Sequence, residues 1–192
     1  PPVFRIQSIE RLPFDARNAL LADAVCALLD CGFTGIMVML EQVEHTKVLG
    51  QVLDEKKVDH TVVTGTLATP ERMRRTERFR SGACRVLITN RAMREGVDIP
   101  RIDAVVLGGG LKAPQLLLQS IGRGVRTAEG KLPWIPVVDV YDAAGCGRHT
   151  RAHAKERMDF YRSEKFVVSS LADVSLLSET LDEVRETGVH QD

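Results

Sequence analysis

The run Gly35-Ile36-Met37-Val38-Met39-Leu40 decides the fold, because none of its side chains is polar. A strand with one solvent-facing side alternates apolar and polar residues, whereas a strand buried on both faces is apolar throughout. Shorter, largely apolar runs follow at 61–63, 85–89, 104–107 and 135–140. We expect these segments to be strands of one sheet whose two faces are both covered.

Amphipathic stretches separate these runs and carry apolar residues three and four positions apart. This spacing is typical of helices that lay one side on a sheet. Strands that alternate with helices predict an α/β domain with a parallel sheet, right-handed crossovers and helices on both faces. The helices are expected at 15–29, 43–53, 69–82, 114–123, 151–163 and 171–186.

Local signals refine this prediction. Asp15 and Thr69 are expected to cap their helices, with Pro70 at the first helical position. Pro1 and Pro2 are expected to start no regular element and to belong to a linker. Ligands of parallel sheets bind at the carboxyl ends of the strands. The loops to inspect therefore follow Leu40, Thr64, Thr89 and Leu107.

Composition bounds the function. The chain of 192 residues carries 26 basic and 26 acidic side chains, which argues against a globally basic nucleic-acid coat protein. Between Glu71 and Arg101 there are nine arginines and only four acidic residues. This block is a candidate phosphate contact or, equally, a solvated helix face. No run of 18 apolar residues occurs, so no membrane span is expected. Four scattered cysteines favour an intracellular, reducing compartment.

The segment Gln119-Ser120-Ile121-Gly122-Arg123-Gly124-Val125-Arg126 carries the strongest sign of chemistry. Gln119, Arg123 and Arg126 are four and three residues apart, so on a helix they form one stripe. Each glycine costs about 1 kcal/mol inside a helix, and both suit close approach of the backbone to a ligand or a neighbouring domain. The planar, always charged guanidinium suits a triphosphate. For two arginines alone, an ordinary surface helix is the favoured alternative.

A second segment, 86–100, runs from a buried strand through a polar turn into Gly96-Val97-Asp98-Ile99-Pro100. Gly96 allows a tight turn, and Asp98 offers a carboxylate to the hydroxyls of a ribose. Thr89, at the strand end, offers a hydroxyl and a backbone N–H to a nucleic-acid phosphate. Because both segments occur in one chain, a nucleotide-dependent function is favoured over an ordinary surface helix.

Together these segments resemble motifs V and VI of the superfamily 2 helicases. The stretch 64–82 is similar to the motif IVa region of that family, and Met37–Glu41 followed by His45 is similar to motif IV. The resemblance covers roughly residues 33–168 and implies a RecA-like fold, a three-layer parallel sheet with helices on both faces. Within the superfamily, segments 110–114, 138–140 and 153–166 look closest to the UvsW-type and XPB-type translocases of double-stranded DNA.

The resemblance implies catalytic roles for the motif VI residues. Arg126 would be the arginine finger, Arg123 a second contact of the γ-phosphate, and Gln119 a residue of the interlobe cleft. Gly96 and Asp98 would border the nucleotide. An arginine aimed at the γ-phosphate is worth roughly 10³ to 10⁵ in rate, because it offsets charge that develops in the transition state.

The resemblance also implies nucleic-acid contacts. Gly65, Thr89 and Arg91 would contact the strand along which the motor tracks. Gln119 stands where many RNA-dependent members have histidine, which favours DNA over RNA as the partner. His45 follows the motif IV strand, and a plain polar loop is an equally good interpretation of it.

Half of an ATP site is missing from the sequence. The segment 108–113 is rich in glycine but lacks the spacing and the Ser or Thr of a phosphate-binding loop. Asp54-Glu55 and Asp182-Glu183 lie in helical patterns and not at strand ends. We expect ATP and Mg²⁺ to be held mainly by an N-terminal RecA-like lobe, on a longer chain or on a partner chain. Alone, this chain is expected not to hydrolyse ATP at a useful rate.

The sequence thus predicts the second motor lobe of an ATP-dependent DNA helicase or translocase. Its rivals are a non-catalytic RecA-like module that binds nucleic acid or acts as a scaffold, and the lobe of an RNA helicase. The expected division is a linker with the first helix at 1–32, the RecA-like domain at 33–168 and an acidic helical tail at 169–192.

Several residues allow a second interpretation. Cys146, His149 and His153 have a spacing that suits zinc, but no fourth ligand follows, so solvated helix residues are preferred and no metal site is predicted. Packing is preferred over base stacking for Trp134. The acidic tail is expected to dock on its own domain, with binding of a partner or of a basic surface as the alternative.

Overall fold

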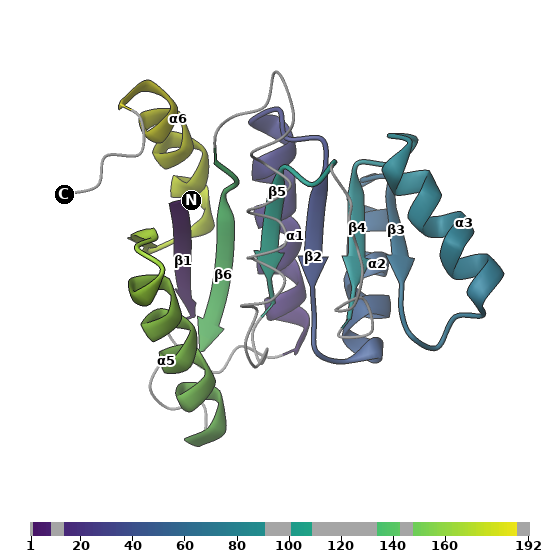
Figure 1. Cartoon of the computed structure of the whole chain (residues 1–192), viewed down its shortest axis with the longest axis horizontal. Helices are drawn as coiled ribbons and strands as arrows, with labels where there is room; N and C mark the ends of the chain where they lie inside the picture. Colours follow the sequence, from purple (N-terminus) through teal and green to yellow (C-terminus); the bar gives the residue numbers. More distant parts are fainter. Residues whose placement is uncertain (1, 9–13, 91–100, 109–133, 143–147, 188–192) are drawn as a thin grey trace.

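The computed structural model describes residues 2–8, 14–90, 101–108, 134–142 and 148–187, and within them seven strands form one sheet in which every pair is parallel (Figure 1). The strands lie in the order β3-β4-β2-β5-β6-β1-β7. Their bounds are β1 Pro2–Ser8, β2 Ile36–Met39, β3 His60–Val63, β4 Val86–Thr89, β5 Ala104–Leu107, β6 Val137–Asp142 and β7 Val167–Leu171. The helices are α1 Phe14–Asp30, α2 Val43–Glu55, α3 Thr69–Arg80, α5 Arg148–Ser163, a short 3-10 helix η2 Val174–Leu176, and α6 Leu177–Thr187.

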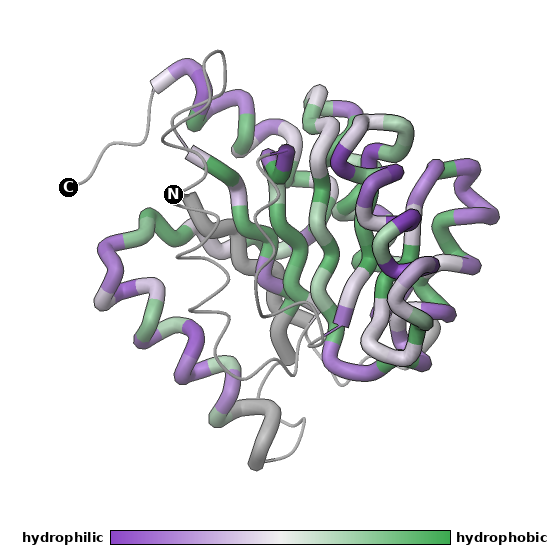
Figure 2. Tube along the Cα trace, turned by 45° about the vertical axis from the view of Figure 1, so that its right-hand side comes forward, coloured by the Kyte–Doolittle hydropathy of each residue, from purple (hydrophilic) through white to green (hydrophobic). Residues whose placement is uncertain are grey.

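The central strands β2, β4 and β5 are buried at every residue, as their apolar sequences predict. Successive side chains point to opposite faces, so each strand contributes to two separate cores. Ile36 and Val38 join one core with residues of α1, α2 and α6, while Met37 and Met39 join the other with Phe79 of α3 and Tyr161 of α5. The expected α/β fold with helices on both faces is thereby confirmed, and Figure 2 shows the hydrophobic strands inside the more hydrophilic helices.

Two strands were not expected from the sequence. β1 begins at Pro2 and lies between β6 and β7, so the prediction that Pro1 and Pro2 start no regular element was wrong at Pro2. Proline is accepted as the first residue of a strand because its missing N–H is not yet needed by the ladder. The strands of the sheet therefore come from all three segments of the expected division, since β7 spans 167–171.

The C-terminal helix begins later than predicted. Leu171 ends β7, η2 follows, and α6 starts at Leu177 and not at 171. The apolar residues at 171, 174 and 177 keep helical spacing, which hides the strand end from a periodicity argument. The tail docks on its own domain, because Leu177 and Leu181 are fully buried in the core beside α1.

Two helix starts differ by one residue from the prediction. α1 begins at Phe14, so Asp15 lies within its first turn. α3 begins at Thr69, so the N-cap position is Ala68, which has no side-chain cap, and Pro70 lies within the first turn. Thr69 is therefore not the cap that was predicted. Of the other expected helices, 114–123 lies outside the described residues.

A carboxylate joins the starts of two central strands. Asp103, just before β5, accepts hydrogen bonds from the backbone N–H of Thr34 at 2.9 Å and of Gly35 at 2.8 Å. Arg101 donates to the Thr34 carbonyl at 3.1 Å. Gly35 is required here, because a Cβ at this position would collide with the Arg101 carbonyl. Trp134 is half-buried against the core, in agreement with the packing role preferred for it.

A buried ion pair fastens α5 to the sheet. Arg157 and Asp139 of β6 are 2% and 0% exposed, and their charged atoms lie 3.1 Å apart. The Nε of Arg157 lies 3.1 Å from both carboxylate oxygens, and the Tyr161 hydroxyl donates to the same carboxylate at 3.3 Å. The carboxylate raises the pKa of Arg157 against the opposing effect of desolvation.

Among the described residues, no helix is long and apolar enough to cross a membrane.

Removal of one member of this pair should leave the other charge buried and unpaired. Arg157→Met is therefore expected to lower the free energy of unfolding by about 3–5 kcal/mol. The double variant Arg157→Met/Asp139→Asn should lose less than the sum of the two single losses, because no unpaired charge remains. Urea unfolding followed by circular dichroism measures both. Additive losses in the double variant would show that the two residues act independently.

Candidate functional site

The carboxyl ends of the central strands meet at one edge of the sheet. Strand register pairs Met39 with Thr89 and with Leu107, and Val63 with Thr89, so the strand ends lie side by side. The chain segments that leave this edge are the loops expected to carry ligands. The N-termini of α2 and α3 lie at the same edge, because these helices follow β2 and β3 directly.

Thr89 lies at this edge but is turned inward. It is fully buried, its hydroxyl donates to the Asn90 carbonyl at 3.3 Å, and its own carbonyl accepts from the Leu40 N–H at 2.9 Å. Because this hydroxyl is buried, a phosphate that approached the edge would contact the residues after Thr89 first. Arg91, the next predicted contact, lies outside the described residues.

Gly65 lies in the exposed turn between β3 and α3. The turn is held by a contact of 2.8 Å between the hydroxyls of Thr64 and Thr66 and by a hydrogen bond from the Leu67 N–H to the Thr64 carbonyl at 3.2 Å. The first N–H groups of a helix have no partner within the helix and carry partial positive charge. An exposed glycine beside the start of α3 therefore leaves room for a phosphate to approach.

Polar residues buried at the same edge were not predicted from the sequence. Asn18 and Thr46 are fully buried, and the Thr46 hydroxyl donates to the Val43 carbonyl at 2.6 Å. Asn18 interrupts the apolar stripe of α1, and a lone amide on such a stripe was the signal that could have marked it. These side chains place hydrogen-bonding groups beneath the loops that follow β2.

His45 belongs to this buried set. It is 7% exposed and lies in the first turn of α2, so it is not the polar loop residue considered above. Desolvation by burial, assisted by the positive charge of Arg17, lowers the pKa of His45 to about 4. The imidazole is therefore neutral near pH 7 and can exchange hydrogen bonds without adding charge to the edge.

The motif VI residues Gln119, Arg123 and Arg126 lie outside the described residues, and so do Gly96 and Asp98. Their roles stay predictions. Among the described residues, no three His, Cys, Asp or Glu side chains gather as metal ligands do. Cys146 and the side chain of His149, considered for zinc, lie outside the described set.

Fold and edge together define a class, the α/β domain that presents loops for a ligand at the carboxyl edge of a parallel sheet. The family model described as "Helicase conserved C-terminal domain" matches residues 22–128, which is more than half of the chain. The chain belongs to this family and is the C-terminal, RecA-like lobe of a superfamily 2 helicase. The predicted superfamily is thereby confirmed.

Individual relatives are longer proteins, and the chain matches only a part of each. It is 36% identical over 89 residues to UvrABC system protein B of Symbiobacterium thermophilum, covering 44% of this chain and 14% of that protein. It is 24% identical over 118 residues to DEAD-box ATP-dependent RNA helicase 36 of Arabidopsis thaliana, covering 62% of this chain and 24% of that protein. The chain thus spans less than a quarter of the length of these two relatives.

A solved structure shows the same fold. Dbp5 of S. cerevisiae bound to RNA and ADP BeF3 superposes with a TM-score of 0.69 at 17% identity, covering 96% of this chain and 44% of that one. The RecA-like class of the sheet is therefore confirmed.

The depressed pKa of His45 makes the stability of the lobe depend on pH. Unfolded histidine titrates near 6.5 and folded His45 near 4, so between these values only the unfolded chain takes up the proton. Stability from the neutral imidazole, about 3 kcal/mol, is complete above pH 6.5 and is lost as the pH falls toward 4. The free energy of unfolding, measured with urea at each pH from 4 to 7.5, should depend less steeply on pH in His45→Gln than in the natural chain. Equal slopes would contradict the assignment.

Proposed function

We propose that this lobe is the second motor lobe of an ATP-dependent DNA helicase or translocase. The observation that carries the proposal is that the family match, residues 22–128, contains the whole stripe Gln119, Arg123 and Arg126. A RecA-like module that served only as a scaffold would have no need for two arginines on one helical stripe that suits contacts to a γ-phosphate. Their retention therefore supports a motor over the non-catalytic alternative.

In this function the lobe supplies charge and orientation. A nucleoside triphosphate with Mg²⁺, held mainly by an N-terminal RecA-like lobe, would supply the bond that is broken. Arg126 acts as the arginine finger, and Arg123 makes a second contact to the γ-phosphate. Gln119 lies at the interlobe cleft, and Gly96 and Asp98 border the nucleotide.

The nucleic acid runs over the carboxyl edge of the sheet. Gly65 offers the exposed turn at the start of α3, and Arg91 follows the strand that ends at Thr89. Each closure of the two lobes moves these contacts one step along the strand. The buried polar groups below the edge, His45 and Thr46 among them, add no charge to it at neutral pH.

DNA is the proposed substrate because Gln119 replaces the histidine of many RNA-dependent members, and because segments 110–114, 138–140 and 153–166 look closest to the UvsW-type and XPB-type translocases. An RNA helicase lobe is the second candidate, favoured by the similarity to a protein named as an RNA helicase. The rate of ATP hydrolysis with double-stranded DNA and with RNA separates the two.

Arg126→Ala, in this lobe joined to its N-terminal lobe, is expected to lower DNA-stimulated ATP hydrolysis by about 10³-fold or more, because the transition-state charge loses its guanidinium. Release of phosphate with saturating double-stranded DNA measures the rate. Arg162→Ala on the exposed face of α5 is the matched control and should keep the natural rate. An unchanged rate in Arg126→Ala would defeat the assignment of the finger.

Gly65→Asp places a carboxylate in the exposed turn at the start of α3. The added charge should weaken DNA binding by about tenfold, because it repels a phosphate that approaches the helix N-terminus. Fluorescence anisotropy of labelled DNA with the joined lobes measures the affinity. Gln51→Asp, exposed on α2 and away from the edge, adds the same charge and should have little effect. Equal losses in both variants would point to net charge alone.

A further inference from the structure

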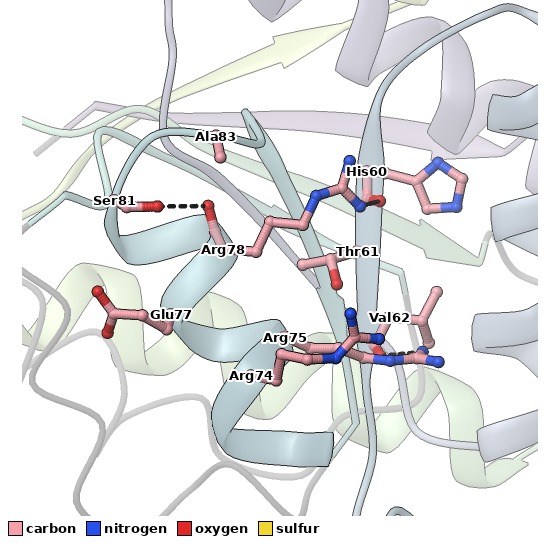
Figure 3. Close-up of a pocket in the computed structure, with 9 residues that line it drawn as sticks. All are labelled: His60, Thr61, Val62, Arg74, Arg75, Glu77, Arg78, Ser81 and Ala83. Carbon is pink, nitrogen blue, oxygen red and sulfur yellow. Dashed lines mark hydrogen bonds between the residues drawn. The ribbon is translucent and has the colours of Figure 1, made fainter. Parts of the chain in front are cut away.

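One open edge of the sheet faces a groove. β3 is the last strand at its end of the sheet, and α3 runs alongside it (Figure 1). A groove of about 810 Å³ lies between the two, with His60, Thr61 and Val62 on the strand side. Arg74, Arg75 and Arg78 extend from the helix toward the strand (Figure 3). An exposed sheet edge is a place where an extended peptide can add as a further strand.

The outer edge of β3 is held by guanidinium groups. Arg75 donates to the Val62 carbonyl at 2.9 Å, and Arg78 donates to the His60 carbonyl at 3.4 Å. These residues are two positions apart, which is the repeat at which strand residues point to the same side. Since the N–H and C=O of one strand residue point the same way, the N–H groups of His60 and Val62 face the groove as well. The edge thus offers donors and acceptors at ladder spacing.

The charges in the groove are easily redirected. Arg74 and Arg75 pair with Glu71 at 2.9 and 2.5 Å, and Arg78 pairs with Asp59 at 2.5 Å. The side chains of Arg75 and Arg78 are 36% and 47% exposed, so their ion pairs are solvent-screened and contribute little to stability. A ligand that brings its own carboxylates can take over these guanidinium groups at small cost.

We propose that this groove binds an acidic, extended peptide segment of a partner protein, which adds to β3 as a further strand. The N–H groups of the peptide would donate to the carbonyls of His60 and Val62. The carbonyls of the peptide would accept from the N–H groups of these two residues. Arg75 and Arg78, released from the strand, would pair with peptide carboxylates. Acidic residues at every second position would all lie on one face of the added strand.

The ladder pattern favours a peptide over a nucleic-acid strand. Phosphates accept hydrogen bonds but donate none, so they cannot satisfy the carbonyls of His60 and Val62 once the arginines leave them. Glu77 lines the groove, and Asp59 and Glu71 border it, so a continuous polyanion would also meet three carboxylates. A peptide whose acidic residues alternate with uncharged ones supplies the N–H groups and brings fewer negative charges to these carboxylates than a polyanion does.

The acidic tail of the same chain does not reach this groove within the described residues. α6 packs on α1, with Leu177 and Leu181 fully buried and Arg185 donating to the Cys31 carbonyl at 2.6 Å. β7, which leads into this tail, is the strand at the opposite end of the sheet from β3. The described part of the tail therefore leaves the groove uncovered.

A fluorescent octapeptide of alternating Glu and Val, blocked at both ends, tests the proposal on the 192-residue chain by anisotropy. We expect saturable binding that weakens at least about tenfold in Arg75→Gln/Arg78→Gln, because two charge-assisted hydrogen bonds are lost. Lys155→Gln/Arg162→Gln removes the same charge on exposed positions of α5, outside the groove, and should bind as the natural chain does. Equal binding by both double variants would overturn the site.

Two further probes separate strand addition from simple charge attraction. An octapeptide of alternating Glu and Pro keeps the carboxylates but lacks half of the N–H groups, so it should bind at least about tenfold more weakly. Val62→Pro removes an outward N–H of β3, which an edge strand tolerates. It should weaken binding of the Glu-Val peptide to a similar extent. If the Glu-Pro peptide binds equally well, or if oligothymidylate but not the Glu-Val peptide depends on Arg75 and Arg78, the proposal is wrong.

Discussion

The complete burial of the three central strands is the constraint on which the rest of the structure depends. Every residue of β2, β4 and β5 is out of contact with water, so both faces of the sheet must be covered by helices. Because the strands are parallel, each connection must return the chain from the carboxyl edge to the opposite edge. Among the described residues, α1, α2, α3 and α5 serve as such connections. The strand ends are therefore the places where polar loops gather.

The carboxyl edge therefore gathers both exposed and buried polar groups. Gly65 is exposed in a turn at the start of a helix, while Thr89, Thr46 and His45 are buried below the loops and carry no charge at neutral pH. This combination gives the edge buried polar groups that are neutral at pH 7, to which other segments can add charge. In the proposed function those charges are the motif VI arginines and the phosphates that they bind.

Much of this arrangement follows from the sequence, because buried parallel strands leave an unbroken apolar signal. The edge strands leave a weaker one: β7 is only half-buried, with serines at 169 and 170, and β1 opens on a proline. The partner of Asp139 could not be derived, since the pairing with Arg157 depends on how α5 lies across β6. Asp139 itself, a lone carboxylate in an apolar run, was visible. The positions of Gly65 and Thr89 at one edge followed from topology, but the inward turn of Thr89 depends on local packing.

The buried pair of Arg157 and Asp139 has a mechanical consequence. A helix held on a sheet by apolar contacts alone can slide by a fraction of a turn, because dispersion is not directional. α5 cannot slide in this way without pulling a guanidinium away from a carboxylate that no water reaches. The ion pair therefore fixes the register of the helix on the strand, and we expect the two to move as one unit.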